Sequence, residues 1–416
     1  MNQECKLLII GKVWPEPNSS AAGGRMMELI RIFQENGFEI TFVTAASESE
    51  FAADLTQIEV ETQTIQLNDS SFNRFVQDLS PDVVMFDRFM TEEQFGWRVA
   101  EECPKAVRIL DTEDLHCLRS ARHKAWKDGE SFHPAQLYDI NITKREIASI
   151  LRCDLSFIIS EYEMDLLINQ FKVDESLLFY LPFLLSPPNP GQNPGFDGRV
   201  DFMSIGNFLH EPNWNATLWL KEQIWPLIRQ NLPDANLNIC GAYPTRKVYQ
   251  LHNEKEGFLI HGRAESVSEV MKQSKVLLAP LRFGAGLKGK LVDAMQFGLP
   301  SVTTKIGAEG IATVDHWNGF VSDSPEEFAN KAVELYMDKQ TWEIAQSRGY
   351  EIIRQKFLKT DFEENLISRF DELLTHLTNH RKKNFMGSML MHHFQQGSKY
   401  MSKWIEEKNS MKSLKK

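Results

Sequence analysis

Short apolar runs of β-type residues alternate with helical stretches along most of the chain, and this alternation constrains the fold more than any other feature. The first half contains five such runs, at Lys6–Gly11, Phe38–Thr44, Asp82–Phe86, Val107–Leu110 and Leu155–Ser160. Strands that alternate with helices form parallel sheets whose two faces are covered by the helices. The first half therefore predicts an α/β domain built on a parallel sheet.

The alternation stops once and then begins again. Residues 182–198 are dense in Pro, Gly and Asn, a composition typical of a linker. Strand-like runs return after it, at Val200–Ile205, Ala235–Cys240, Phe258–His261, Val276–Ala279 and Ser301–Thr304. We expect two facing doubly wound, Rossmann-like domains, with a ligand cleft outside the carboxyl ends of their strands. The predicted parts are a first domain (1–184), a linker (185–198), a second domain (199–350), closing helices (351–380) and a basic tail (381–416).

Composition excludes several classes of function. A chain of 416 residues suits two domains, and its net charge of −11 argues against a nucleic-acid partner. The five cysteines form no CxxC pair, so neither a disulfide framework nor a zinc site is indicated. No apolar run has the length of a membrane span or of a signal-peptide core. We expect a cytoplasmic protein.

A glycine-rich loop with two lysines joins one predicted strand to a helix. The loop follows Val276–Ala279, and the helix is expected to begin near Leu287 and to end at Phe297. Lys288 and Lys290 then lie in the first helical turn, where the helix dipole disfavours positive charge. Such a violation of local rules suggests a bound anion that completes the site.

The loop also supplies what a phosphate needs. Gly284, Gly286 and Gly289 leave backbone N–H groups accessible beside the two lysines. We therefore favour an anion site over a solvated basic turn. Two familiar phosphate motifs do not fit: Leu291 replaces the Ser or Thr that a P-loop needs for magnesium, and no acidic residue follows Thr304 to hold a dinucleotide ribose.

With these residues in view, the sequence resembles a known family. Residues 280–304, PLRFGAGLKGKLVDAMQFGLPSVTT, with Gly307–Gly310, resemble the donor-binding core of group 1 (GT4-like) glycosyltransferases of the GT-B fold, in the subgroup with a GAGxKxK core. Residues 202–207 and 212–216 look like the opening of that subgroup's second domain. Residues 17–25 and 111–116 resemble its first domain more loosely.

The resemblance implies a bilobed enzyme that moves a sugar from a nucleotide-sugar donor to an acceptor, usually with retention of configuration and without a metal. Leaving-group charge would be met by Lys288 and Lys290, and no Asp-x-Asp motif occurs in the chain. Of the family's two glutamates eight residues apart, Ala285 stands at the first position and Asp293 at the second, where we expect it to hold the ribose. Asn207 stands where many relatives have an arginine for the diphosphate.

Further residues are expected to line the cleft. The resemblance implies that Gly206 and Asn207 approach the donor and that Glu309 and Gly310 lie beneath the donor sugar, although an exposed turn remains an alternative. Glu113, Asp114 and His116 are all candidates for contact with the transferred sugar, or for a loop held by its own hydrogen bonds. The candidates at the start of the first helix are Gly23, Gly24 and Arg25, the last of which would bind an anion or be a plain surface arginine.

The tail differs in charge from the rest of the chain. Residues 381–416 carry nine Lys or Arg and two Glu, a net charge of +7, which leaves −18 on the preceding residues. Apolar residues such as Met389, Tyr400 and Trp404 lie among the basic ones, which is typical of a segment bound at an anionic membrane surface. A solvated tail or a dimer contact would give the same composition.

A membrane-bound tail would suit an enzyme that acts on a lipid-linked acceptor. We expect a saccharide or lipid-linked acceptor.

Two other functions suit the same architecture. A sugar-nucleotide epimerase has the same fold, and a catalytically silent nucleotide-sugar-binding protein is made plausible by Ala285 and Asn207. The donor's base and sugar, and the acceptor, are not encoded in any motif that we find.

Overall fold

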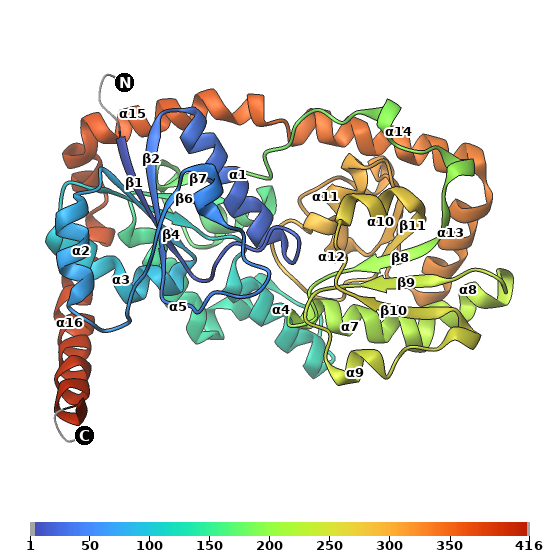
Figure 1. Ribbon diagram of the computed structural model, residues 1–416, viewed down its shortest axis with the longest axis horizontal. Coiled ribbons are helices and arrows are strands. Elements are labelled where there is room, and N and C mark those ends of the chain that lie inside the picture. The colour runs from blue at the N-terminus through green and yellow to red at the C-terminus, as the bar shows by residue number, and fades with distance from the viewer. Residues whose placement is uncertain (1–4, 414–416) are drawn as a thin grey trace.

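The computed structural model describes residues 5–413 and shows two α/β domains side by side (Figure 1). Each domain has one sheet, and the pairs between neighbouring strands are parallel in both sheets. Helices cover both faces of each sheet (Figure 1). The expected fold class, two doubly wound Rossmann-like domains with parallel sheets, is confirmed.

The sheet of the first domain has seven strands in the order β3-β2-β1-β4-β5-β6-β7. Its strands are β1 (Cys5–Gly11), β2 (Phe38–Thr44), β3 (Glu61–Thr64), β4 (Val83–Asp87), β5 (Val107–Asp111), β6 (Leu155–Ile158) and β7 (Leu178–Tyr180). Its helices are α1 (Ala21–Glu35), α2 (Ser71–Leu79), α3 (Phe89–Glu102), α4 (His116–Asp128), α5 (Asn141–Arg152) and α6 (Glu161–Asp165).

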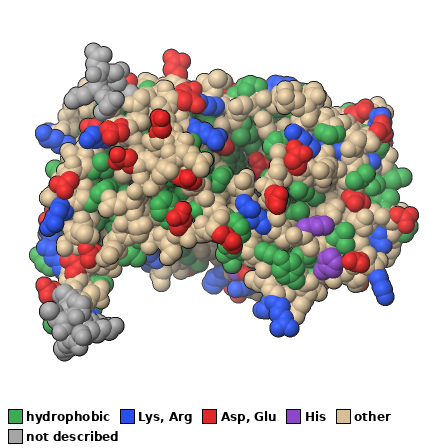
Figure 2. Space-filling view, viewed as in Figure 1, with side chains coloured by type: hydrophobic (Ala, Val, Ile, Leu, Met, Phe, Trp, Pro, Cys, Tyr) green, Lys and Arg blue, Asp and Glu red, His purple; other side chains and the backbone are tan. Residues whose placement is uncertain are grey.

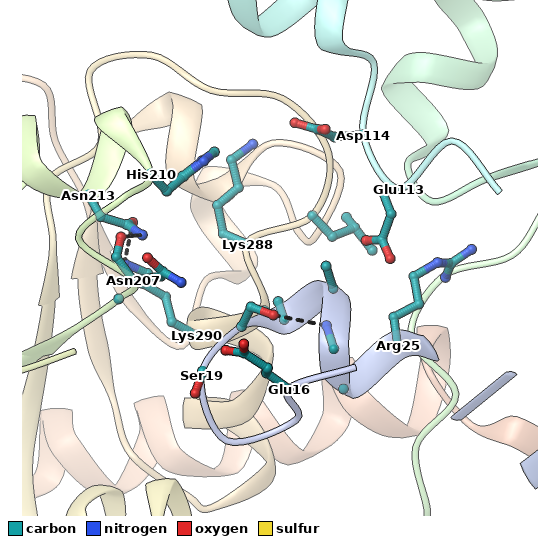
Figure 3. Close-up of a pocket in the computed structure, with 18 of the residues that line it drawn as sticks. Glu16, Ser19, Arg25, Glu113, Asp114, Asn207, His210, Asn213, Lys288 and Lys290 are labelled. Atoms are coloured by element: carbon teal, nitrogen blue, oxygen red, sulfur yellow. Dashed lines mark hydrogen bonds between the residues drawn. The ribbon is translucent and has the colours of Figure 1, made fainter. Parts of the chain in front are cut away.

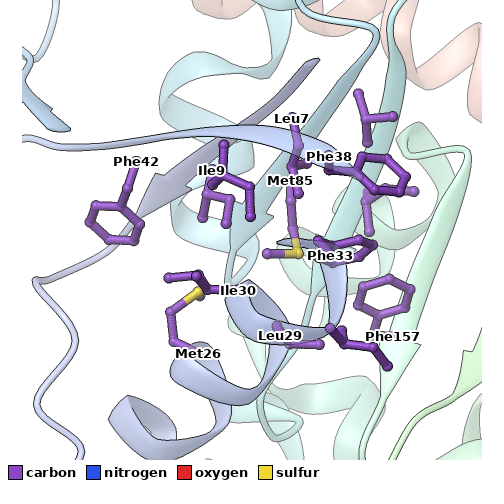
Figure 4. Close-up of a cluster of buried hydrophobic side chains, with 14 of the residues drawn as sticks. Leu7, Ile9, Met26, Leu29, Ile30, Phe33, Phe38, Phe42, Met85 and Phe157 are labelled. Carbon is purple, nitrogen blue, oxygen red and sulfur yellow. The ribbon is translucent and has the colours of Figure 1, made fainter. Parts of the chain in front are cut away.

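The central strand β1 shows why the first domain has two cores. Successive side chains of a strand point to opposite faces of the sheet. Leu7 and Ile9 join the cluster around α1, which Figure 4 shows, whereas Leu8 and Ile10 join the cluster on the other face. All four side chains are buried, which explains the continuous apolar run in the sequence.

The second domain repeats the design with six strands in the order β10-β9-β8-β11-β12-β13. Its strands are β8 (Val200–Ile205), β9 (Leu237–Cys240), β10 (Phe258–Gly262), β11 (Ser274–Ala279), β12 (Ser301–Thr303) and β13 (Gly319–Val321). Its helices are α7 (Glu211–Trp219), α8 (Trp225–Asn231), α9 (Arg246–Tyr249), α10 (Val267–Gln273), α11 (Gly289–Gln296), α12 (Lys305–Ala308), α13 (Pro325–Met337) and α14 (Lys339–Lys356).

The two domains are joined by the chain at two neighbouring points. The backbone N–H of Leu185 donates to Phe357 (2.7 Å), and that of Lys359 donates to the carbonyl of Leu185 (2.9 Å), so the two crossings lie side by side. The second crossing leads into α15 (Lys359–Lys383), which runs back over the first domain (Figure 1). Leu366 and Phe370 of α15 are fully buried in the core around α1.

Within the described part of the basic tail, residues 385–413 form a helix, α16 (Phe385–Ser413), which packs against α3 and α5 of the first domain (Figure 1). Ser402 is buried and accepts a hydrogen bond from Arg98, whose guanidinium also pairs with Glu406. The Arg152 guanidinium lies 4.1 Å from the ring centre of Phe394. Much of this segment is therefore a docked helix. No helix among the described residues is long and apolar enough to cross a membrane.

Candidate active site

One cleft of about 740 Å³ lies between the two domains. It opens at the carboxyl ends of strands from both sheets, the place where open α/β sheets bind ligands. Figure 3 shows Lys288 and Lys290 of the second domain on one side and Glu113 and Arg25 of the first domain on the other, with the Arg25 guanidinium pointing away from the lysines. The space-filling view shows the same hollow between the domains (Figure 2). The predicted site residues that line this cleft are Gly23, Gly24, Arg25, Glu113, Asp114, His116, Gly206, Asn207, Gly284, Lys288, Lys290 and Asp293.

The loop between β11 and α11 places the two lysines at the start of the helix. The helix begins at Gly289, two residues later than expected, with Lys288 at the N-cap, and no side chain caps it. Gly298 ends the helix region with a φ of 63°, as a C-terminal glycine should. The Nζ of Lys288 donates to the carbonyl of Gly286 (2.7 Å), and that of Lys290 donates to Asn213 (2.8 Å).

Lys288 is buried and Lys290 is partly buried, and neither has an ion-pair partner among the described residues. Burial lowers the pKa of Lys290 to about 7. Burial also lowers the pKa of Lys288 to about 8, although the charge of Glu309 opposes this. A desolvated cation without a counter-ion is costly, and an anion in the cleft would relieve that cost. The helix N-terminus adds partial positive charge at the same place.

Asp293 lies one turn further along α11 and also faces the cleft. Burial, together with the charge of Glu28 on α1, raises the pKa of Asp293 to about 7. Glu28 itself accepts a hydrogen bond from the backbone N–H of Leu184 (2.9 Å). Asp293 is thus a carboxyl group at the cleft wall that can accept a hydrogen bond from a ligand hydroxyl.

Two of the first-domain candidates follow β5 on a loop with unusual backbone geometry. Glu113 has a φ of 62°, a left-handed conformation that costs energy for a residue other than glycine and is often found at functional sites. Burial raises the pKa of Glu113 to about 8, and the charge of Asp111 adds to the effect. Burial would raise the pKa of Asp114 too, but Arg119 and His116 hold it at about 2.

His116 begins α4 at the edge of the cleft. Its Nε2 lies 3.5 Å from Asp114, and its ring packs edge-on against Phe89. Burial lowers the pKa of His116 to about 4, against the pull of Asp114. The imidazole is therefore neutral at neutral pH and can both donate and accept a hydrogen bond.

The three candidates on α1 have different roles in the structure. A Cβ on Gly23 would lie 2.4 Å from the backbone of Glu16, whereas one on Gly24 would meet nothing within 4 Å. Arg25 is buried and donates to Asp111 (2.9 Å) and to the carbonyls of Leu181 and Pro182. Its guanidinium thus ties α1 to β5 and to the segment that leaves the first domain.

Gly206 and Asn207 follow β8 and lie beside the lysine pair. A Cβ on Gly206 would come within 2.7 Å of the Nζ of Lys290, so a larger residue there would push the end of the lysine side chain aside. The side-chain oxygen of Asn207 accepts from the backbone N–H of Leu209 (2.9 Å), and its carbonyl accepts from Asn213 (2.9 Å). Asn207 therefore shapes the turn that carries Asn213.

Three predicted residues lie outside the cleft lining. Gly286 packs against Asp114 of the first domain, where an added Cβ would be 2.8 Å from the Asp114 Cβ. Gly310 is similarly close to Ser160. Glu309, expected in the sugar pocket, instead forms a bidentate ion pair with Arg122 of α4 (2.7 Å for each contact). These residues hold the two domains together.

Sequence reasoning missed several residues of the cleft. Arg88 directly follows β4, with a φ of 70°, so its place at a strand end was available as a signal. Asn213 lies within residues 212–216 of the resemblance, and His210 lies two residues before them. Glu16 comes from a loop without a local signal, whereas Ser19 lies within residues 17–25 of the looser resemblance. No group of three or more His, Cys, Asp or Glu side chains within residues 5–413 is arranged to hold a metal ion.

Comparison with known proteins agrees with this architecture. Residues 199–338 match the family model described as "Glycosyl transferases group 1". An uncharacterised 44.6 kDa protein of the cps region of Klebsiella pneumoniae is 26% identical over 163 residues, which are 37% of this chain and 42% of that protein. The aligned part thus spans less than half of that relative.

Solved structures of the same fold include two proteins in complex with UDP and one glycosyltransferase. Anabaena Alr3699/HepE, in complex with UDP and glucose, is 15% identical with a TM-score of 0.66 and covers 89% of this chain and 100% of its own. A mutant of S. aureus TarM, in complex with Fondaparinux, alpha-GlcNAc-glycerol and UDP, is 15% identical with a TM-score of 0.56, over 72% of this chain and 58% of its own. WaaG, a glycosyltransferase of lipopolysaccharide biosynthesis, is 13% identical with a TM-score of 0.61, over 87% and 98%. The second domain therefore resembles a group 1 glycosyltransferase domain, and the chain as a whole has the GT-B fold of these structures.

Proposed function

We propose that this protein transfers a sugar from a nucleotide-sugar donor to an acceptor in the interdomain cleft. The observation that carries the proposal is the pair of desolvated lysines, Lys288 and Lys290, at the uncapped N-terminus of α11. A diphosphate supplies the negative charge that this arrangement lacks. The match of residues 199–338 to group 1 glycosyltransferases and the UDP bound to the structural neighbour HepE support the same ligand class. We assign the chain to the subgroup with a GAGxKxK core.

The lysines would act where charge develops. In the reaction, the bond between the sugar's anomeric carbon and the diphosphate oxygen breaks, and its electron pair goes to the diphosphate. The acceptor oxygen bonds to the anomeric carbon, and the acceptor's hydroxyl proton departs, in a retaining enzyme to the leaving phosphate. Preorganised positive charge at the leaving group lowers the barrier most when it needs no rearrangement. Lys288, Lys290 and the N–H groups of α11 would supply that charge without a metal.

The remaining cleft residues of the two domains would contact different parts of the substrates. Asp293 would accept a hydrogen bond from a ribose hydroxyl, because its carboxyl lies on α11 beyond the two lysines. His116, neutral at neutral pH, would contact the transferred sugar from the first domain together with Glu113 or Asp114. The acceptor, a saccharide or a lipid-linked saccharide, would enter along the first-domain wall.

A thermal-shift screen tests the donor assignment directly. A ligand that binds only the native state raises the melting temperature. Nucleoside diphosphates and their sugars are compared with the matching nucleoside monophosphates at equal concentration. We expect at least one diphosphate to raise Tm more than its monophosphate. A screen in which no nucleotide shifts Tm would refute a donor site in this cleft.

We also propose peripheral contact with an anionic membrane through α16. The side of this helix turned away from α3 and α5 carries exposed apolar residues, here called the outer stripe: Phe385, Met386, Met389, Tyr400, Met401, Trp404 and Met411. Tyr and Trp are favoured at membrane interfaces. The net charge of +7 on residues 381–416, against −18 elsewhere, favours an anionic lipid surface over a second copy of the same basic helix.

Vesicle sedimentation tests this contact. Tyr400 and Trp404 are exposed by 63% and 59%, so replacing both with Ser leaves the docked side of α16 unchanged. We expect the wild type to sediment with phosphatidylglycerol vesicles, and less with phosphatidylcholine vesicles, and the double variant to lose this binding. The matched control is Met337→Ser, at a position exposed by 63% on α13. Equal sedimentation of wild type and double variant would contradict the proposal.

A further inference from the structure

Helix α4 of the first domain contacts the donor loop of the second domain, defined here as residues 282–288. The guanidinium of Arg122 donates to the carbonyl of Gly284 (2.9 Å) and to Glu309. His123 stacks on Phe283, with ring centres 4.4 Å apart. Arg122 is 5% exposed, so its contacts are shielded from water. The loop that presents the lysines is thus held from outside its own domain.

One buried carboxyl group adds hydrogen bonds to the backbone of both segments. The Oε1 atom of Glu163, on α6, accepts a hydrogen bond from the backbone N–H of Gly286 (2.8 Å) and another from that of Leu115 (2.9 Å). Gly286 belongs to the donor loop, and Leu115 stands at the N-cap of α4, next to His116. A single oxygen atom therefore joins the two loops that face each other across the cleft.

The surroundings of Glu163 favour a persistent hydrogen-bonded bridge between the two loops. Its side chain is fully buried, and Gly286 has a φ of 62° and no room for a Cβ beside Asp114. The second oxygen, Oε2, has no hydrogen-bond partner among the described residues. Burial and the charge of Asp114 raise the pKa of Glu163 to about 8, so Gln resembles the form that prevails at neutral pH.

Glu146 provides a comparison within the same helix start. Its two oxygens accept from the backbone N–H groups of His116 (3.0 Å) and Cys117 (2.8 Å). Like Glu163 it is buried and caps α4, but its hydrogen bonds stay within the first domain. The two glutamates therefore differ in one respect that matters here, the bond to Gly286.

We infer that Glu163 is a positioning residue that fixes the donor loop against the start of α4, with Arg122 as its second anchor, and thereby couples the diphosphate site to the sugar-contacting side of the cleft. The inference rests on the proposed function in one respect, that this loop binds the donor. Its test does not depend on that function. Loss of the bridge frees two backbone N–H groups, one in each domain, at the same time.

Hydrogen exchange of the full-length protein, followed by mass spectrometry, measures this directly. Glu163→Ala is expected to speed exchange in peptides covering both 113–118 and 282–291. Glu146→Ala is expected to speed it in 113–118 alone. Glu163→Gln keeps an acceptor oxygen and should restore slow exchange in both peptides. Unchanged exchange in 282–291 for Glu163→Ala, or a Gln variant as fast as the Ala variant, would overturn the inference.

A second variant covers the case in which Glu163→Ala does not fold. Arg122→Ala removes the contacts to Gly284 and Glu309 and should speed exchange in 282–291. If exchange there is unchanged, Arg122 does not anchor the donor loop.

UDP, ADP and GDP are then added separately to the wild type. Slower exchange in 282–291 with one of them supports the whole account, whereas no effect of any nucleotide refutes the donor site and leaves the result on the bridge intact. The affinity for the bound nucleotide should fall about tenfold in Glu163→Ala, the effect of one lost hydrogen bond.

Discussion

Lys290 donates a hydrogen bond from its Nζ to the Oδ1 of Asn213, 2.8 Å away. Among the described residues the ammonium group thus has a neutral amide as its hydrogen-bond partner and no ion pair. An amide oxygen satisfies one N–H but leaves the charge uncompensated. Gly206 lies so close that a Cβ there would be 2.7 Å from the Nζ. Lys290 is thus held in place at the cleft wall, and burial makes its charged form less stable.

Removal of this lysine should weaken nucleotide binding. We expect Lys290→Ala to raise the Kd for the nucleoside diphosphate found by thermal shift by about 10–100-fold, as for a lost charge-assisted hydrogen bond. Isothermal titration calorimetry measures the change. Lys305→Ala is the control, because Lys305 is an exposed lysine of the same domain that pairs with Asp323. Equal Kd values for both variants would argue against Lys290 as a ligand.

Affinity for the nucleotide should depend on pH. In the free protein Lys290 and Lys288 have pKa values lowered by burial to about 7 and about 8, so both lose their charge as the pH rises through this range. The anion binds the charged forms, and binding therefore takes up protons. We expect Kd to rise between pH 7 and pH 9, by up to about tenfold per pH unit for each proton taken up. Lys290→Arg, which stays charged, should flatten the profile; a flat profile in the wild type would contradict the account.

Asp293 should show opposite effects on stability and on binding. Its pKa in the folded protein, about 7, lies above the ordinary value of 3.8 for an aspartate, so the native state holds an extra proton between these pH values. Stability therefore falls as the pH rises through that window, and the cost is complete above pH 7. Asp293→Asn should raise Tm at pH 8 by about 2–4 °C, the shift expected for ~1 kcal/mol, and by less at pH 5.

The same variant should bind the nucleotide less well, by about tenfold, if the carboxylate holds the ribose. A deoxyribose analogue of the nucleotide tests whether the lost affinity comes from the contact with the ribose hydroxyl. It should bind wild type and variant with similar affinity. A variant that is more stable and binds the ribonucleotide as tightly as the wild type would remove Asp293 from the site.

Two adjacent glycines of α1 should respond differently to the same substitution. Gly24→Ala meets no atom within 4 Å and should stabilise the helix by about 1 kcal/mol. Gly23→Ala places a Cβ 2.4 Å from the backbone of Glu16 and must displace the loop of residues 12–20, which lines the cleft. Chemical denaturation and nucleotide titration of both variants check this. Equal stability of the two variants would show that the approach of Glu16 to α1 is not retained in solution.

The central strands and the donor loop were predictable from the sequence, for a physical reason. Strands buried on both faces give continuous apolar runs, such as that of β1, and the lysines of the loop break a local rule that can be seen without a structure. The edge strands β3, β7 and β13 were missed, since short strands with half-exposed residues carry weak patterns.

Contacts between the domains could not be predicted in this way. Glu163 lies 123 residues from Gly286, and Arg122 lies 187 residues from Glu309, so no local pattern links them. Glu309 was expected in the sugar pocket because its loop resembles that of the family, but its carboxylate is bound to Arg122. Only the assembled domains reveal which charged residues face the cleft and which hold it together.

Release of nucleoside diphosphate from a sugar nucleotide tests the central claim most directly. The sugar nucleotide that gives the largest thermal shift is incubated with wild type and with Lys288→Ala, with and without candidate acceptors, and the products are separated. We predict release of the diphosphate by the wild type and a turnover lower by about two orders of magnitude in Lys288→Ala, because stabilisation of the leaving group is lost. Equal rates in both proteins, or an epimerised sugar nucleotide without diphosphate release, would contradict the account.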